Sequence, residues 1–63
     1  MKIMQREITD SHILTIRTCW GRKYMYSAYN KHTGERLEEH IGTIEGCRKR
    51  FVTFLENDLC DVL

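Results

Sequence analysis

The chain has 63 residues, of which 41% are hydrophobic and 30% are charged, and its formal net charge is +1. This length allows one small domain, residues 1–63, with a marginal core, and the composition is that of a folded chain rather than a disordered one. Because the net charge is close to zero, the chain as a whole is not drawn to nucleic acid or to an anionic membrane.

The chain carries no signal for export or membrane insertion. Its apolar runs are too short to cross a bilayer, and the first residues lack the apolar core of a signal peptide. The three cysteines, Cys19, Cys47 and Cys60, are odd in number and widely spaced. Such spacing is typical of thiols kept reduced, so we expect a cytoplasmic protein.

The first two thirds of the chain predict an antiparallel meander. Residues 12–20 and 23–29 alternate in polarity and are rich in β-branched and aromatic side chains. Residues 35–41 form a more polar strand that suits a sheet edge, and short turns separate the three segments. Residues 1–8 alternate poorly, and the sequence leaves open whether they add a fourth strand or form a frayed tail.

A single helix should follow the sheet. Thr43 is a good N-cap residue and Glu45 places a negative charge in the first turn. From Ile44 to about Val62 the apolar residues recur at helical spacing. The fold class is therefore α+β, a meander of three or four strands with one C-terminal helix packed on one face.

The helix has two features beyond those needed for packing. Its apolar side chains cover an arc of roughly 160°, wider than one sheet requires, so part of this strip either joins the core or contacts a partner. Its charges run basic to acidic, against the helix dipole. An antiparallel helix pair in a two-fold dimer would match those charges, whereas the alternative is two solvated clusters. The predicted interface residues are Arg48, Lys49, Arg50, Phe54, Glu56, Asp58 and Asp61.

The phase of the tyrosine-rich strand decides what the other sheet face offers. If Met25, Ser27 and Tyr29 face the helix, Tyr24 and Tyr26 form an exposed stacking surface for bases. In the opposite phase that surface disappears, and Met25, Ser27 and Tyr29 form a face better suited to protein contact. The residues of the nucleic-acid alternative are Arg17, Arg22, Lys23, Tyr24, Tyr26, Lys31 and Arg36.

Two resemblances bear on this choice. Tyr24 and Tyr26 in one strand, the hairpin at Thr33 and Gly34, and a helix after Thr43 resemble the small DNA-binding module at the N-terminus of some phage integrases. The resemblance covers roughly half of the chain and implies DNA contact through the sheet, although the strongly basic character of such modules is missing. The same order of elements also resembles small antitoxin-type folds.

Residues that would mark an enzyme are scarce. The four glycines are scattered singly, and no Cys-x-x-Cys or His-Glu-x-x-His spacing occurs. Cys47 with His40 could pair a nucleophile with a base, but Cys47 lies on the apolar helix face and reads as a core residue. We therefore expect no enzyme, cofactor, metal or small-molecule substrate. The sequence predicts a binding module acting through protein contact, with another protein or a second copy, in the manner of a small regulator or inhibitor from phage or mobile elements.

Overall fold

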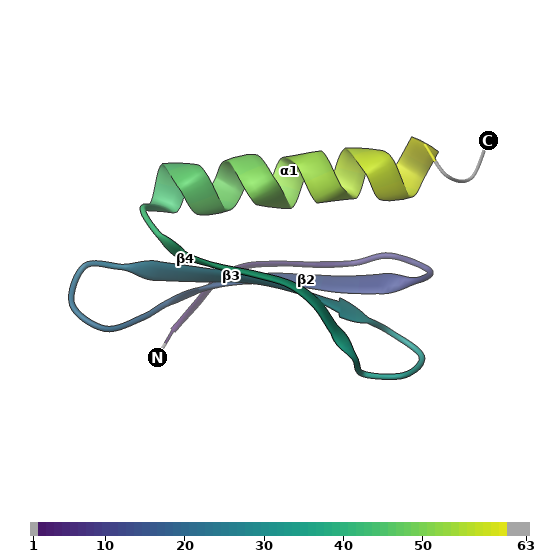
Figure 1. The fold of residues 1–63 in the computed structure, drawn as a ribbon, viewed down its shortest axis with the longest axis horizontal. Coiled ribbons are helices and arrows are strands. Elements are labelled where there is room, and N and C mark those ends of the chain that lie inside the picture. The colour runs from purple at the N-terminus through teal and green to yellow at the C-terminus, as the bar shows by residue number, and fades with distance from the viewer. Residues whose placement is uncertain (1, 61–63) are drawn as a thin grey trace.

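The computed structural model describes residues 2–60, which form a four-stranded antiparallel sheet followed by one helix (Figure 1). The strands are β1 (Ile3–Ile8), β2 (His12–Thr18), β3 (Tyr24–Asn30) and β4 (Arg36–Gly42), and their order in the sheet is that of the chain. The helix α1 (Ile44–Cys60) runs along the sheet on one side. The predicted α+β class is confirmed, and residues 3–8 form the fourth strand that the sequence left open.

The turns between strands are built by local side-chain and glycine geometry. Between β1 and β2, the Thr9 hydroxyl accepts a hydrogen bond from the His12 backbone amide at 2.9 Å. The β2–β3 turn places Gly21 at a φ of 62°, a conformation that a residue without Cβ adopts at no steric cost. Between β3 and β4, the Asn30 side chain accepts from the Thr33 amide at 3.1 Å, and Gly34 has a φ of 77°. Short connections of this kind fix antiparallel neighbours.

The core lies between α1 and the two central strands. Pairing places Ile16 opposite Tyr26 and Leu14 opposite Ala28, so these side chains share one sheet face. The helix presents Cys47 and Phe51 to that face. The fully or almost fully buried apolar side chains are Leu14, Ile16, Tyr26, Ala28, Cys47 and Phe51.

The start of α1 follows the predicted capping pattern. The Thr43 hydroxyl accepts from the Gly46 amide at 3.1 Å, and the Thr43 carbonyl accepts from the Cys47 amide at 3.0 Å. These bonds satisfy two of the amides that a helix N-terminus leaves without partners. Glu45 lies in the first turn, where its charge suits the helix dipole.

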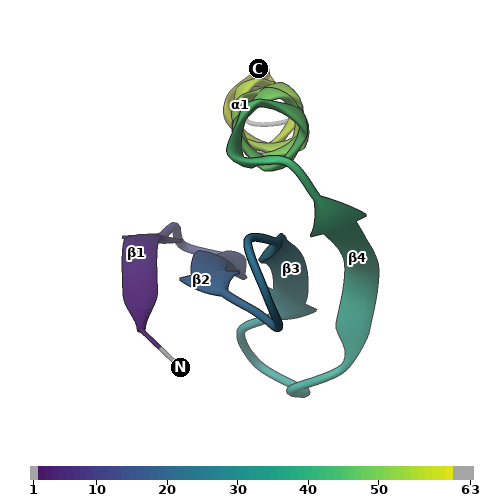
Figure 2. The same ribbon diagram turned by 90° about the vertical axis from the view of Figure 1, so that its left-hand side faces the viewer.

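The helix covers only part of the sheet. Within the described residues it contacts β2, β3 and β4 but not β1, and every residue of β1 is exposed. Figure 2 shows α1 on one side of the sheet and no other element on the opposite side. Within this part of the chain, no helix combines the length and the apolar character that a membrane crossing requires.

Candidate functional site

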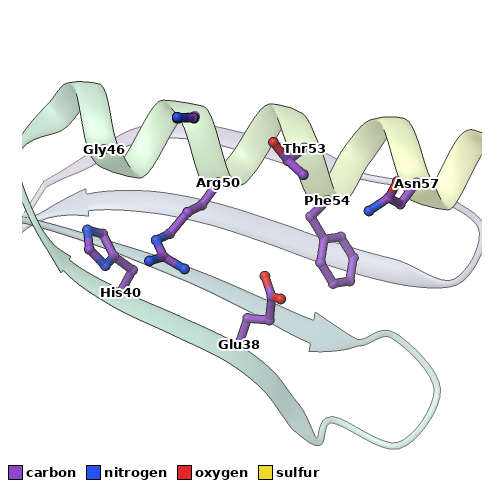
Figure 3. A pocket seen from close by; sticks show the side chains of 8 residues that line it. Glu38, His40, Gly46, Arg50, Thr53, Phe54 and Asn57 are labelled. Carbon is purple, nitrogen blue, oxygen red and sulfur yellow. The ribbon is translucent and has the colours of Figure 1, made fainter.

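A groove runs between α1 and β4 and is the first of two surfaces that could bind a ligand or partner (Figure 3). Its volume is about 400 Å³, within the range of ligand pockets. The residues that line it come from one strand and one helix: Glu38, His40, Gly46, Lys49, Arg50, Thr53, Phe54 and Asn57.

The carboxylate in this groove is already engaged. The Tyr26 hydroxyl donates a hydrogen bond to Glu38 Oε1 at 3.0 Å. Burial raises the pKa of the Tyr26 phenol, and the hydrogen bond to Glu38 raises it further, because both disfavour the phenolate. Arg50 extends from α1 into the space between His40 and Glu38 and partly opposes that shift (Figure 3). This end of the groove is therefore polar, with positive and negative groups side by side.

Two glycines leave room for the His40 ring. A Cβ atom on Gly42 would lie 3.2 Å from His40 Nε2, and one on Gly46 would lie 3.3 Å from the same atom. The nearby Cys47 Sγ lies 3.9 Å from the backbone carbonyl oxygen of His40. Cys47 is 0% exposed and so lies in the core, as the sequence indicated, and this burial raises the pKa of its thiol.

The groove holds no recognisable reaction centre. Among the described residues, no three His, Cys, Asp or Glu side chains gather closely enough to hold a metal ion. Its cationic side chains Lys49 and Arg50 are exposed, and Glu38 is paired with Tyr26. The arrangement can contact a polar or anionic group at the surface, but water screens such charges and weakens the contact.

A second cluster joins the far end of α1 to the sheet. His12 Nδ1 lies 2.6 Å from Asp58 Oδ1, and both side chains are largely shielded from solvent. The rings of His12 and Phe54 pack edge to face, with their centroids 4.9 Å apart. His12 ties β2 to the helix end.

The second candidate surface is the sheet face opposite α1, which we call the open sheet face. Thr15 and Ser27 alternate with the core residues of β2 and β3 and so point to this face. The register of the neighbouring strands extends it over the whole sheet. Its apolar and aromatic members are Ile3, Ile8, Ile13, Met25, Tyr29 and Ile41, and its polar members are Arg6, Thr15, Arg17, Ser27, Arg36 and Glu39.

The composition of the open sheet face departs from that of a solvated sheet. A sheet face in water normally carries polar residues at alternate positions. Here half of the positions are apolar or aromatic, and Ile3, Ile8 and Ile41 are each about half exposed. Ser27 is 0% exposed and Thr15 is 5% exposed. Because no other element of residues 2–60 covers Thr15 and Ser27, larger side chains on the same face must shield them from solvent.

The polar groups of this face are only partly satisfied. Arg36 and Glu39 form an ion pair at 2.7 Å on β4. Within the described residues, the buried atoms Arg17 Nε and Ser27 Oγ have no hydrogen-bond partner. Buried polar atoms usually have a partner, and these two exceptions both lie on the open sheet face.

The predicted helix interface is partly used inside the chain. Phe54 packs on His12, and Asp58 pairs with it. Arg48, Lys49, Arg50 and Glu56 are exposed, whereas Asp61 lies outside the described residues. Most of the apolar side chains of α1 face the core, whereas Val52 is 47% exposed. The helix-pair dimer stays a prediction, but less apolar surface is left for it than the sequence suggested.

The predicted nucleic-acid residues are divided between surfaces. Tyr26 is buried under α1, and Tyr24 lies partly buried against the same core, so the strand has the phase in which the tyrosine stacking surface is absent. Arg17 and Arg36 point to the open sheet face. The remaining three lie in turns at opposite ends of the sheet: Arg22, Lys23 and Lys31.

Comparison of the chain with protein families, curated proteins and solved structures gives no match. The groove and the open sheet face are therefore the two candidate functional sites of the chain.

Proposed function

We propose that the chain is a non-enzymatic binding module that acts through protein–protein contact at the open sheet face. The observation that carries this proposal is the set of apolar side chains on a face that no other element of residues 2–60 covers. Apolar side chains in contact with water gain free energy when a partner removes them from it, by about 25 cal/mol per Å² buried. Half-exposed apolar side chains gathered on one face of a small domain are therefore characteristic of an interaction surface.

The anatomy of this face supports a protein partner. Protein interfaces have an apolar, aromatic centre and a polar rim, in which arginine is enriched. The open sheet face contains the same kinds of residue, apolar or aromatic at six positions and arginine at three, although a polar row of Arg6, Thr15, Ser27 and Glu39 crosses its middle. Nucleic-acid surfaces are more polar and more strongly basic than this face, in which half of the positions are apolar or aromatic.

The proposal can be tested by photo-crosslinking in the cells that make the protein. A benzophenone amino acid would replace Tyr29 on the open sheet face or, as the matched control, Val52 on the exposed side of α1. We expect a discrete protein adduct at position 29 and none at position 52. Excess unlabelled chain should compete with the adduct, whereas excess Met25→Glu chain should not. An adduct with nucleic acid, or no adduct at position 29, would overturn the proposal.

A further inference from the structure

The pattern of charges on the open sheet face suggests what covers it. Its residues form three rows that cross the four strands. The middle row runs Arg6, Thr15, Ser27, Glu39, so its two ends carry opposite charges on the two edge strands. One end row begins with Ile3 on β1 and finishes with Ile41 on β4. Glu39 Oε2 already accepts from Arg36 at 2.7 Å, so a contact with a second copy would use its other carboxylate oxygen. A surface with opposite charges at the two ends of one row is complementary to itself.

We propose that the partner is a second copy of this chain, packed face to face about a two-fold axis parallel to the strands. This inference rests on the proposed function and names the partner of the same surface. A two-fold interface uses the same patch on both copies. Rotation about this axis places β1 of one copy over β4 of the other. Arg6 then faces the second copy's Glu39, and Glu39 faces its Arg6, so one sequence makes two opposite-charge contacts.

The other residues agree with this axis. Ile3 faces the second copy's Ile41, and Ile13 faces its Tyr29, which places apolar groups against apolar groups. Sheets that pack face to face stay within about 30° of alignment, so these pairings describe neighbours rather than single contacts. The axis also sets two arginines against apolar groups, because Arg17 faces the second copy's Met25 and Arg36 faces its Ile8. The aliphatic stem of an arginine packs on apolar groups, and arginine is enriched at protein interfaces.

The other simple arrangement is disfavoured by the same charges. A two-fold axis across the strands would place β1 over the second copy's β1 and β4 over its β4. Arg6 would then face Arg6, and Glu39 would face Glu39. Like charges set opposite each other across an interface cost free energy and select against that arrangement. The charge pattern thus distinguishes between two arrangements that bury the same apolar side chains.

The size of the face suits a dimer that dissociates on dilution. Four strands at about 4.8 Å spacing and seven residues at about 3.3 Å rise give a footprint on the order of 400 Å² per copy. Side-chain relief makes the accessible area larger, so the two copies together approach the roughly 1,200 Å² at which stable specific interfaces begin. The dimer should therefore be observable at high protein concentration and lost at low concentration.

The test is a charge exchange followed by sedimentation equilibrium. Arg6→Glu and Glu39→Arg, each alone, create two like-charge contacts, so we expect the dissociation constant to rise by about tenfold or more. An equimolar mixture of the two variants restores both opposite-charge contacts and should recover the wild-type dimer. Arg48→Glu on α1 is the matched control and should leave association unchanged. Circular dichroism of each variant checks that the fold is kept.

Several outcomes would overturn the inference. One is a strict monomer at all concentrations; if Tyr29 then crosslinks to a different protein, the proposed function stands and only the self-pairing fails. A second is preferential pairing of Arg6→Glu with the wild type, which indicates the axis across the strands. Loss of association in Arg48→Glu alone would indicate a helix interface. A mass increase that nuclease treatment removes would indicate bound nucleic acid.

Discussion

His12 Nδ1 lies 2.6 Å from Asp58 Oδ1, and this contact joins the first residue of β2 to the last turn of α1. A carboxylate near a helix C-terminus is disfavoured by the helix dipole, and α1 has no basic residue in its last turn to compensate. The imidazole of His12 supplies that compensation from the sheet. The contact therefore explains how the helix tolerates an acidic end, and it fixes the distal end of α1 to the sheet.

Replacing Asp58 with Asn should weaken the attachment of α1. The contact is mostly shielded from solvent, so we expect the free energy of unfolding to fall by roughly 1–2 kcal/mol. Urea denaturation at neutral pH measures this loss. The control is Glu56→Gln, an exposed carboxylate two residues away, which should change stability by less than about 0.5 kcal/mol. Equal effects from the two variants would contradict a role for the His12 contact.

Phe51 is the principal attachment of α1 to the core. It is 2% exposed, and its ring meets Tyr26 at a centroid distance of 6.4 Å. Phe51→Ala should cost about 3–5 kcal/mol, because a cavity replaces the ring. A chain of this length has a total stability of roughly 3–9 kcal/mol, so the variant should be largely unfolded by circular dichroism. The neighbouring Val52→Ala, on the exposed side, should stay folded; a folded Phe51→Ala with near wild-type stability would refute this packing.

Tyr26 makes the stability of the fold depend on pH in the alkaline range. Its folded-state pKa lies above the ordinary value of 10.0, first because of burial and then because of Glu38. The neutral phenol therefore stabilises the fold below pH 10, and this contribution is lost as the pH rises further. Tyr26→Phe, which cannot ionise, should be less stable than the wild type at pH 7 by about 1 kcal/mol, because one hydrogen bond is lost.

The pH dependence of the stability difference between wild type and Tyr26→Phe tests whether burial raises the pKa of Tyr26. Denaturation at pH 7 and at pH 11 should show that the gap between wild type and Tyr26→Phe narrows or reverses at pH 11. Other groups that titrate in this range affect both proteins alike. If both proteins lose the same stability between pH 7 and pH 11, burial in the fold does not raise the pKa of Tyr26.

The two described thiols should differ in reactivity. Cys47 is fully buried and burial raises its pKa, so its thiolate, the reactive form, is scarce in the folded chain. Cys19 is partly exposed near the β2–β3 turn. In a Cys60→Ser background, a disulfide reagent should modify Cys19 first and Cys47 only as the chain unfolds, as peptide mass mapping would show. Modification of both at the same rate under native conditions would contradict the buried position of Cys47.

Sequence periodicity was sufficient to predict the fold. The alternation at Leu14 and Ile16 and the cap at Thr43 are local signals, and the structure confirms both the meander and the helix start. The fourth strand was uncertain because residues 3–8 are exposed throughout, so no buried face imposes alternation on them. A strand held only by pairing to one neighbour leaves a weak pattern in the sequence.

The candidate surfaces were harder to predict. Which side Tyr26 faces depends on a shift of one residue, and both of its neighbours, Met25 and Ser27, are also plausible on either side. The contact of His12 with Asp58 joins residues 46 positions apart, which no local spacing reveals. The pairing of Arg6 and Glu39 within one row required the register of three strand pairs. Long-range register, rather than composition, is what defines the open sheet face.

The most direct test of the open sheet face as a contact surface is the solution mass of the purified chain over a wide concentration range. Sedimentation equilibrium at low and high salt should show a mass that rises from 7.6 kDa toward twice that value with concentration. Because apolar contacts dominate the proposed interface, salt should change the midpoint only modestly. Met25→Glu should abolish the rise. A mass of 7.6 kDa at every concentration and salt level, or a rise that Met25→Glu leaves intact, would contradict self-pairing through the open sheet face.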